Sequence, residues 1–163
     1  MDTHSSHTTD LFTSAATTAH EGLFAFETVL RGLKDADLHR ADPDGGWTVA
    51  QIVSHIHLSG LLWIADVERM RHDPKLFMFR EELGHDVLGA APPSAQEAAD
   101  RIASLRHALD TCLPAADPAI ADKELEVPPF GTMTITQWMP GLIGHMLGHT
   151  EQVMEILRKR GIL

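Results

Sequence analysis

Apolar side chains recur at intervals of three and four residues along four long segments of the chain. This period is typical of amphipathic helices that bury one face. The pattern predicts helices over residues 10–33, 49–71, 95–113 and 136–159. Four such helices on a chain of 163 residues are most simply buried against one another. We therefore predict an all-α fold, a four-helix bundle over residues 10–163 that follows a flexible polar tail at 1–9.

The start of the second predicted helix carries clear local signals. Thr48 and Gln51 have the spacing of a capping box, in which each side chain bonds the other residue's backbone N–H. Trp47 and Ile52, on either side of the cap, have the spacing of a hydrophobic staple. We therefore expect the helix to begin at Val49.

Two long connections interrupt the predicted helices. Residues 72–93 follow the second helix and residues 114–135 follow the third, with a Pro-rich turn predicted at 127–131. Ser94 and Glu97 form a second candidate capping box where the first connection ends. Connections of this length allow the helices to pack in an order that differs from their order in the chain.

Charge narrows the range of partners. The chain has 13 Lys and Arg against 23 Asp and Glu, a formal net charge of −10. Because phosphate groups repel such a protein, we expect no nucleic-acid partner and no binding to an anionic membrane surface. No apolar run is long enough to span a bilayer.

Cysteine usage and the first residues bear on the compartment. Cys112 is the single cysteine, so the chain forms no internal disulfide, and its place in the third apolar seam favours buried packing. The polar N-terminal residues lack the apolar core of a secretory signal. We expect a cytoplasmic protein.

Histidine is the unusual component, with 11 residues in the chain. His145 and His149 lie four residues apart in the last predicted helix, a spacing that places both side chains on one helix face. Two imidazoles in this arrangement can bind one metal ion. In the second helix, His55 and His57 are both candidates for a third ligand. They lie on opposite flanks of the apolar stripe, each about 100° from its centre, so helical periodicity does not choose between them.

Other polar residues near these histidines are open to more than one interpretation. Gln152 lies where it can hydrogen-bond a ligand or substrate, or simply flank the helix, and Glu151 is interpreted as a solvated charge. His20 lies beside the first apolar seam, where we favour a polar contact near the core over a place in the cavity. The sequence offers no dedicated general base.

Two stretches resemble the DinB-like superfamily of metal-dependent proteins. Residues 46–56, GWTVAQIVSHI, are similar to the start of the family's second helix, with a Trp, a Ser or Thr, an apolar pair and a His in this order. Residues 144–153, GHMLGHTEQV, are similar to the last helix, with two histidines, a Gln and an aliphatic residue. Together and in this order, the two motifs are fairly specific.

The resemblance implies a four-helix bundle, often dimeric, in which three histidines bind a metal. Carried over by position, these ligands are His55, His145 and His149, so the resemblance selects His55 over His57. Three imidazoles leave an open coordination position, as in catalytic sites, and zinc and nickel both suit this donor set.

Relatives in the family imply the activity that we expect. The protein is expected to bind one divalent metal ion and to act as a low-molecular-weight-thiol-dependent S-transferase on a small-molecule substrate, as a homodimer. The alternatives are a metal-dependent hydrolase and a helical bundle that binds a metal or ligand without catalysis.

Overall fold

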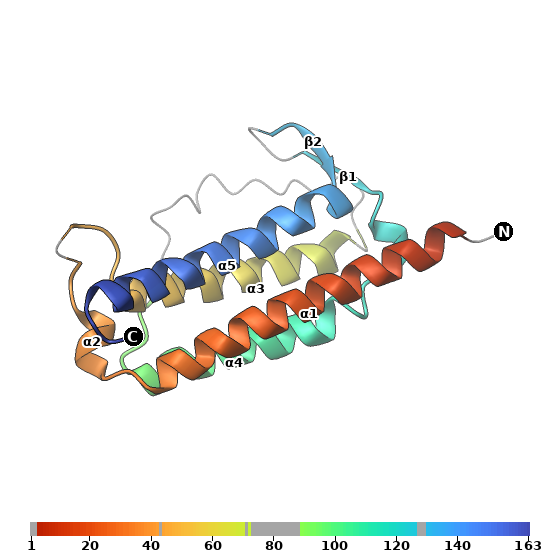
Figure 1. The fold of residues 1–163 in the computed structure, drawn as a ribbon. Coiled ribbons are helices and arrows are strands. Elements are labelled where there is room, and N and C mark those ends of the chain that lie inside the picture. Colours follow the sequence, from red (N-terminus) through yellow and green to blue (C-terminus); the bar gives the residue numbers. More distant parts are fainter. Residues whose placement is uncertain (1–2, 43, 71, 73–88, 127–129) are drawn as a thin grey trace.

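The computed structural model describes residues 3–42, 44–70, 72, 89–126 and 130–163. Within this part of the chain, long helices dominate (Figure 1). They are α1 (Thr3–Arg31), α3 (Val49–Met70), α4 (Ala95–Cys112) and α5 (Ile135–Lys159). The all-α fold and the bundle are confirmed.

The observed helix boundaries agree closely with the predicted ones except at the N-terminus. There α1 begins at Thr3 instead of residue 10, because the polar residues in between include no Gly or Pro that would stop a helix. The backbone of residues 3–9 is thus helical. The flexibility of this segment stays a prediction.

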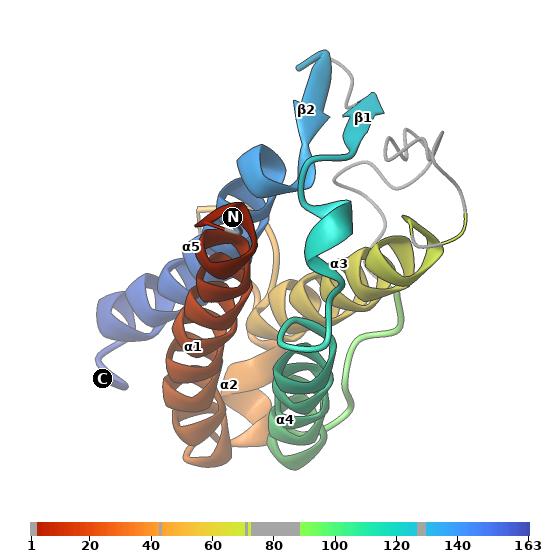
Figure 2. The same cartoon turned by 90° about the vertical axis from the view of Figure 1, so that its right-hand side faces the viewer.

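The bundle does not follow the order of the chain. Helix α1 packs against α4 and α5, and α3 packs against the same two helices, so α1 and α3 lie diagonally opposite (Figure 2). Helices α1 and α5 both begin at the end that carries the short strands, whereas α3 and α4 begin near α2 at the other end (Figure 1). The long connections make this order possible, as predicted.

The connections also contain short elements. Helix α2 (Asp35–His39) follows α1, and a 3₁₀ turn (Pro118–Ile120) follows α4. Strands β1 (Glu124–Glu126) and β2 (Thr132–Thr134) pair antiparallel, with Leu125 opposite Met133. This hairpin was not predicted from the sequence, although the two threonines of β2 favour a strand. The strands flank the predicted turn at 127–131, of which residues 127–129 lie outside the described part, as do residues 73–88 of the first connection.

The predicted helix caps are formed in whole or in part. The Thr48 N–H donates to Gln51 Oε1 at 2.8 Å, and the Gln51 N–H donates to Thr48 Oγ1 at 3.2 Å, which completes the box before α3. Before α4, the Glu97 N–H donates to Ser94 Oγ at 3.1 Å. The Glu97 carboxylate pairs instead with Arg101 one turn later, so only half of that box forms.

One continuous core fills the space between the long helices. Its largest fully buried side chains come from the long helices α1, α3 and α4 and from the short helix α2. They include Phe12, Phe26, Leu38, Ile52, Trp63, Ile102 and Leu105. Cys112 is buried in this core, as predicted. No helix in the described part of the chain has both the length and the apolar character needed to cross a membrane.

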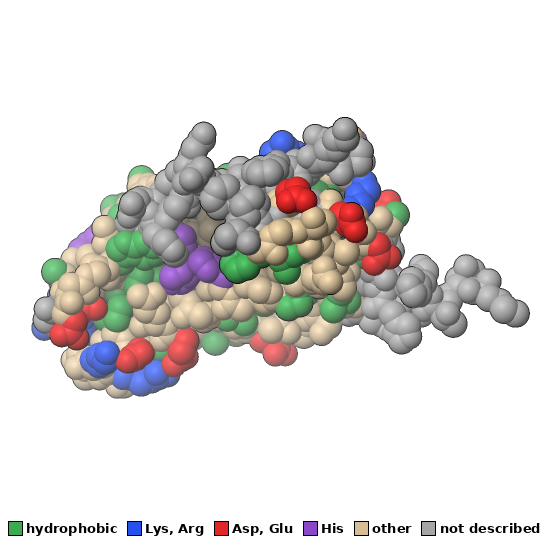
Figure 3. Space-filling view, turned by 90° about the horizontal axis from the view of Figure 1, so that it is seen from above, with side chains coloured by type: hydrophobic (Ala, Val, Ile, Leu, Met, Phe, Trp, Pro, Cys, Tyr) green, Lys and Arg blue, Asp and Glu red, His purple; other side chains and the backbone are tan. Residues whose placement is uncertain are grey.

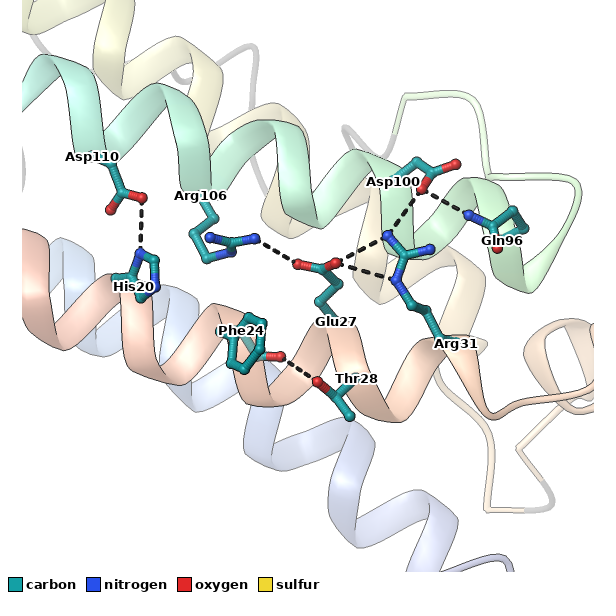
Figure 4. A network of polar contacts seen from close by, with 9 residues as sticks. All are labelled: His20, Phe24, Glu27, Thr28, Arg31, Gln96, Asp100, Arg106 and Asp110. Atoms are coloured by element: carbon teal, nitrogen blue, oxygen red, sulfur yellow. Dashed lines mark hydrogen bonds and ion pairs between the residues drawn. The ribbon is translucent and has the colours of Figure 1, made fainter.

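A charged network joins α1 to α4 on the side of the bundle away from α3 (Figure 4). The buried Glu27 accepts hydrogen bonds from Arg31 at 2.9 Å and from Arg106 at 3.0 Å. Burial by itself would raise the pKa of Glu27, but the hydrogen bonds and positive charges of the two arginines outweigh it and lower the pKa. Glu27 is therefore held as a carboxylate in the seam.

Candidate metal site

Two neighbouring helices supply the three histidines. Helix α3, started by its capping box, carries His55 on its second turn. Helix α5 carries His145 and His149 one turn apart, and it too begins with a capping box, in which the Gln137 N–H donates to Thr134 Oγ1. Because α3 and α5 pack side by side, residues far apart in the sequence meet at their interface.

The three rings form a tight group. One nitrogen from each histidine lies within 4.8 Å of the others. The Nε2 atoms of His55 and His145 are 3.1 Å apart, and the His145 and His149 ring centroids are separated by 4.6 Å in an edge-on arrangement. The structure therefore brings together the three residues that the family resemblance selected.

Exposure increases across the cluster. His55 is buried with 7% of its surface exposed, His149 is half-buried, and His145 is exposed. Histidine side chains accordingly gather at the surface, next to hydrophobic side chains (Figure 3). The cluster is thus anchored in the core at one side and accessible to small molecules at the other.

Gln152 and Glu151 follow His149 but point to different partners. Gln152 Oε1 lies 2.9 Å from His149 Nδ1, one turn along α5. The Glu151 carboxylate pairs with Arg158 at 2.8 Å, and both of these side chains are exposed. Gln152 therefore belongs to the surroundings of the cluster, whereas Glu151 is the solvated charge that the sequence indicated.

Trp47 is a site residue whose role the sequence analysis missed. Its ring centroid lies 5.0 Å from that of His55 and 6.0 Å from that of His149, nearly parallel to the latter with 28° between the planes. The sequence pattern assigns Trp47 only a staple contact at the start of α3. The sequence signal for this role was the position of Trp47 two helical turns before His55, because a side chain next to the cap can fold back over the first turns of the helix.

The remaining candidate histidines lie apart from the cluster. His57 is half-buried, and burial together with the positive charge of Arg101 lowers its pKa. His20 Nδ1 lies 2.8 Å from Asp110 Oδ2 between α1 and α4, so His20 makes a polar contact, as we favoured, but at a partly exposed position (Figure 4).

The donor set fits a divalent metal ion. Two imidazole nitrogens that each lie about 2.1 Å from one ion are separated by roughly 3 to 3.5 Å. The 3.1 Å between the His55 and His145 nitrogens falls in this range, and the group of three lies within 4.8 Å, so a bound ion would draw the rings closer together. Zinc and nickel both accept imidazole ligands. Three nitrogen donors also leave room for a further ligand from solution.

Comparisons with known proteins agree with this picture. The model of a family described as the DinB superfamily matches residues 21–153. A solved structure of YfiT from Bacillus subtilis, described as a probable metal-dependent hydrolase with an unusual four-helix bundle topology, is similar with a TM-score of 0.74. The match covers 92% of this chain and 87% of that one at 15% identity, which shows a shared fold. No curated protein matches significantly. Since the family model spans most of its length, the chain belongs to the DinB superfamily.

Proposed function

We propose that the protein binds one divalent metal ion through His55, His145 and His149 and acts as a low-molecular-weight-thiol-dependent S-transferase. The observation that carries this proposal is the convergence of three imidazole nitrogens from two helices within 4.8 Å, with one of the three rings exposed. In the reaction, a small thiol loses its proton to solvent and its sulfur forms a bond to an electrophilic carbon of the substrate. The bond from that carbon to the leaving group breaks, and the leaving group departs with the electron pair.

The donor set supports chemistry with an anionic nucleophile. Neutral imidazoles leave the charge of a divalent ion uncompensated, which favours an anion as the additional ligand. When bound, the metal would supply deprotonation of a thiol at neutral pH, where a free thiol is mostly protonated. We propose zinc or nickel, because both suit three nitrogen donors.

The residues of the cluster and its surroundings have different roles in the proposed reaction. His55 is held by the core and gives the site a fixed point, while His145 lies on the open side where thiol and substrate can enter. The Trp47 ring lies next to the His55 and His149 rings and offers an apolar wall against which a substrate carbon skeleton can pack.

A metal-dependent hydrolase is the second candidate. The structural match to YfiT, which is described as a probable metal-dependent hydrolase, favours it. The same three histidines would then serve a water nucleophile instead of a thiol. The two candidates share the site and differ in the nucleophile, a thiol or water, and in the substrates that they turn over.

An activity panel distinguishes these candidates. Untagged, metal-loaded protein is incubated with small electrophiles in the presence and absence of low-molecular-weight thiols, and with ester and amide substrates. Turnover that requires both thiol and metal, and that is lost in His149→Ala, supports the transferase. Turnover of esters or amides without thiol supports the hydrolase. Stoichiometric metal without turnover of any substrate would contradict both and favour a metal- or ligand-binding bundle.

We further propose that the protein is a homodimer, which the family resemblance supports, and that it is cytoplasmic, which its single cysteine and polar N-terminal residues support. Size-exclusion chromatography with light scattering measures the mass in solution directly. A mass twice that of the 17.9 kDa chain is expected. A mass of one chain at micromolar concentration would contradict the dimer.

A further inference from the structure

We infer that Gln152 is a positioning residue that fixes the tautomer of His149, so that the imidazole carries its proton on Nδ1 and presents the Nε2 lone pair to the metal. This inference rests on the proposed metal site. Gln152 is exposed, and a residue that only flanks the helix would not have this role.

The contact on which the inference is built is short and local. Gln152 Oε1 lies 2.9 Å from His149 Nδ1, and the two residues are three positions apart on α5, where side chains are neighbours on the helix surface. A neutral imidazole has one N–H, and an amide oxygen only accepts hydrogen bonds. With the Gln152 amide in this orientation, the contact requires the proton of His149 to lie on Nδ1.

The other surroundings of His149 agree with this orientation. The Trp47 ring is stacked against the His149 ring, which restricts how the imidazole can turn. His55 and His145 approach each other through their Nε2 atoms. With Nδ1 of His149 engaged by Gln152, its Nε2 is the nitrogen left to join this group.

The alternative is a Gln152 amide turned by half a rotation. Its NH₂ group would then donate to His149 Nδ1, the proton of the imidazole would move to Nε2, and the metal-binding nitrogen would be blocked. Glutamate separates the two cases because a carboxylate only accepts. Gln152→Glu leaves the proton of His149 on Nδ1 in our assignment and moves it from Nε2 to Nδ1 in the alternative, while Gln152→Leu removes the contact in both.

The adjacent residue provides a matched control. Glu151 is exposed and paired with Arg158, so Glu151→Gln changes one charge on the same turn without touching His149. The exposure of Gln152 also means that its replacement leaves the buried core intact. Circular dichroism and thermal unfolding verify this for each variant.

Two measurements test the inference. In metal-free protein at about pH 8, above the usual histidine pKa, long-range ¹⁵N–¹H NMR reads the tautomer of His149. Titration with Zn²⁺ gives the affinity. We expect the Nδ1–H form in wild type and in Gln152→Glu, and a mixture of tautomers in Gln152→Leu. Zinc affinity should fall about 10- to 100-fold in Gln152→Leu and should stay at or above the wild-type value in Gln152→Glu and Glu151→Gln.

The two measurements can fail independently. Wild-type protein with the His149 proton on Nε2, or a Gln152→Leu variant with unchanged tautomer and zinc affinity, would overturn the role of Gln152 even if the metal site is real. A wild-type protein with the Nδ1–H tautomer that binds no zinc would support the positioning by Gln152 and contradict the proposed metal site instead.

Discussion

The indole of Trp47 lies nearly parallel to the imidazole of His149, with ring centroids 6.0 Å apart and 28° between the planes. The same indole contacts the His55 ring at 5.0 Å. Trp47, which directly precedes the capping residue of α3, therefore lies next to a histidine from each of the two helices that form the site. This contact couples the loop before α3 to the geometry of the cluster.

The position of Trp47 predicts a fluorescence signal for metal binding. Ni²⁺ quenches nearby indoles, and Trp47 is the tryptophan that contacts the histidine cluster, whereas Trp63 and Trp138 pack against each other with centroids 6.0 Å apart. Titration with Ni²⁺ should quench the wild-type emission, and Trp47→Phe should lose most of this response. Equal quenching in Trp47→Phe would place the bound metal elsewhere.

The contact between α3 and α4 predicts a strong effect of one methyl group. A Cβ added at Gly60 would lie 2.5 Å from Cδ1 of Leu105, which is fully buried. Gly60→Ala should therefore destabilise the fold by about 1–3 kcal/mol through overpacking, measured by urea unfolding. A Cβ added at Gly141, in α5, would meet nothing within 4 Å. Gly141→Ala should stabilise the protein by up to about 1 kcal/mol through helix propensity, and equal effects of the two substitutions would contradict the packing.

The ion pairs of Glu27 between α1 and α4 predict that the protein loses stability in acid. The arginines lower the pKa of Glu27 below its usual value of 4.5. A carboxylate whose pKa is lower in the folded state stabilises the fold above the pKa of the unfolded chain, and this stabilisation is lost as the pH falls through the folded pKa.

Replacement of Glu27 tests this acid dependence. A glutamine at this position would keep the size of the side chain and remove its charge, so Glu27→Gln should lower the free energy of unfolding by about 1–2 kcal/mol at pH 7, with a smaller difference near pH 3. Glu21→Gln, at an exposed position of the same helix, is the control and should change stability little. A Glu27→Gln deficit that stays constant from pH 7 to pH 3 would contradict the charge-based account.

Much of the fold follows from local sequence signals. The period of apolar residues located α3, α4 and α5 to within one residue, because capping residues such as Thr48 and Ser94 fix where a helix begins. The predicted start of α1 is too late because polar Thr and His residues give no apolar period even when the backbone is helical. The β1–β2 hairpin was missed because three-residue strands are too short to show an alternation.

The candidate site needed information beyond periodicity. The i, i+4 spacing placed His145 and His149 on one face of α5, but His55 and His57 were equivalent on the helical wheel until the family resemblance chose between them. The structure explains why the choice matters: α5 packs on the side of α3 that presents His55, whereas His57 faces Arg101 on α4. Which faces of two helices pack together depends on long-range packing and cannot be predicted from the sequence of either helix alone.

The central claim is that His55, His145 and His149 bind one divalent metal ion. Elemental analysis of untagged protein, purified without chelators, measures it directly in wild type, His145→Ala and His57→Ala. Because His145 is exposed, its removal should leave the fold intact, and His57→Ala is a matched control beside His55. We predict about one equivalent of zinc or nickel in wild type and His57→Ala, and loss of the metal in folded His145→Ala. Wild-type protein that binds no divalent metal even after incubation with excess Zn²⁺ or Ni²⁺, or His145→Ala that retains a full equivalent, would contradict the account.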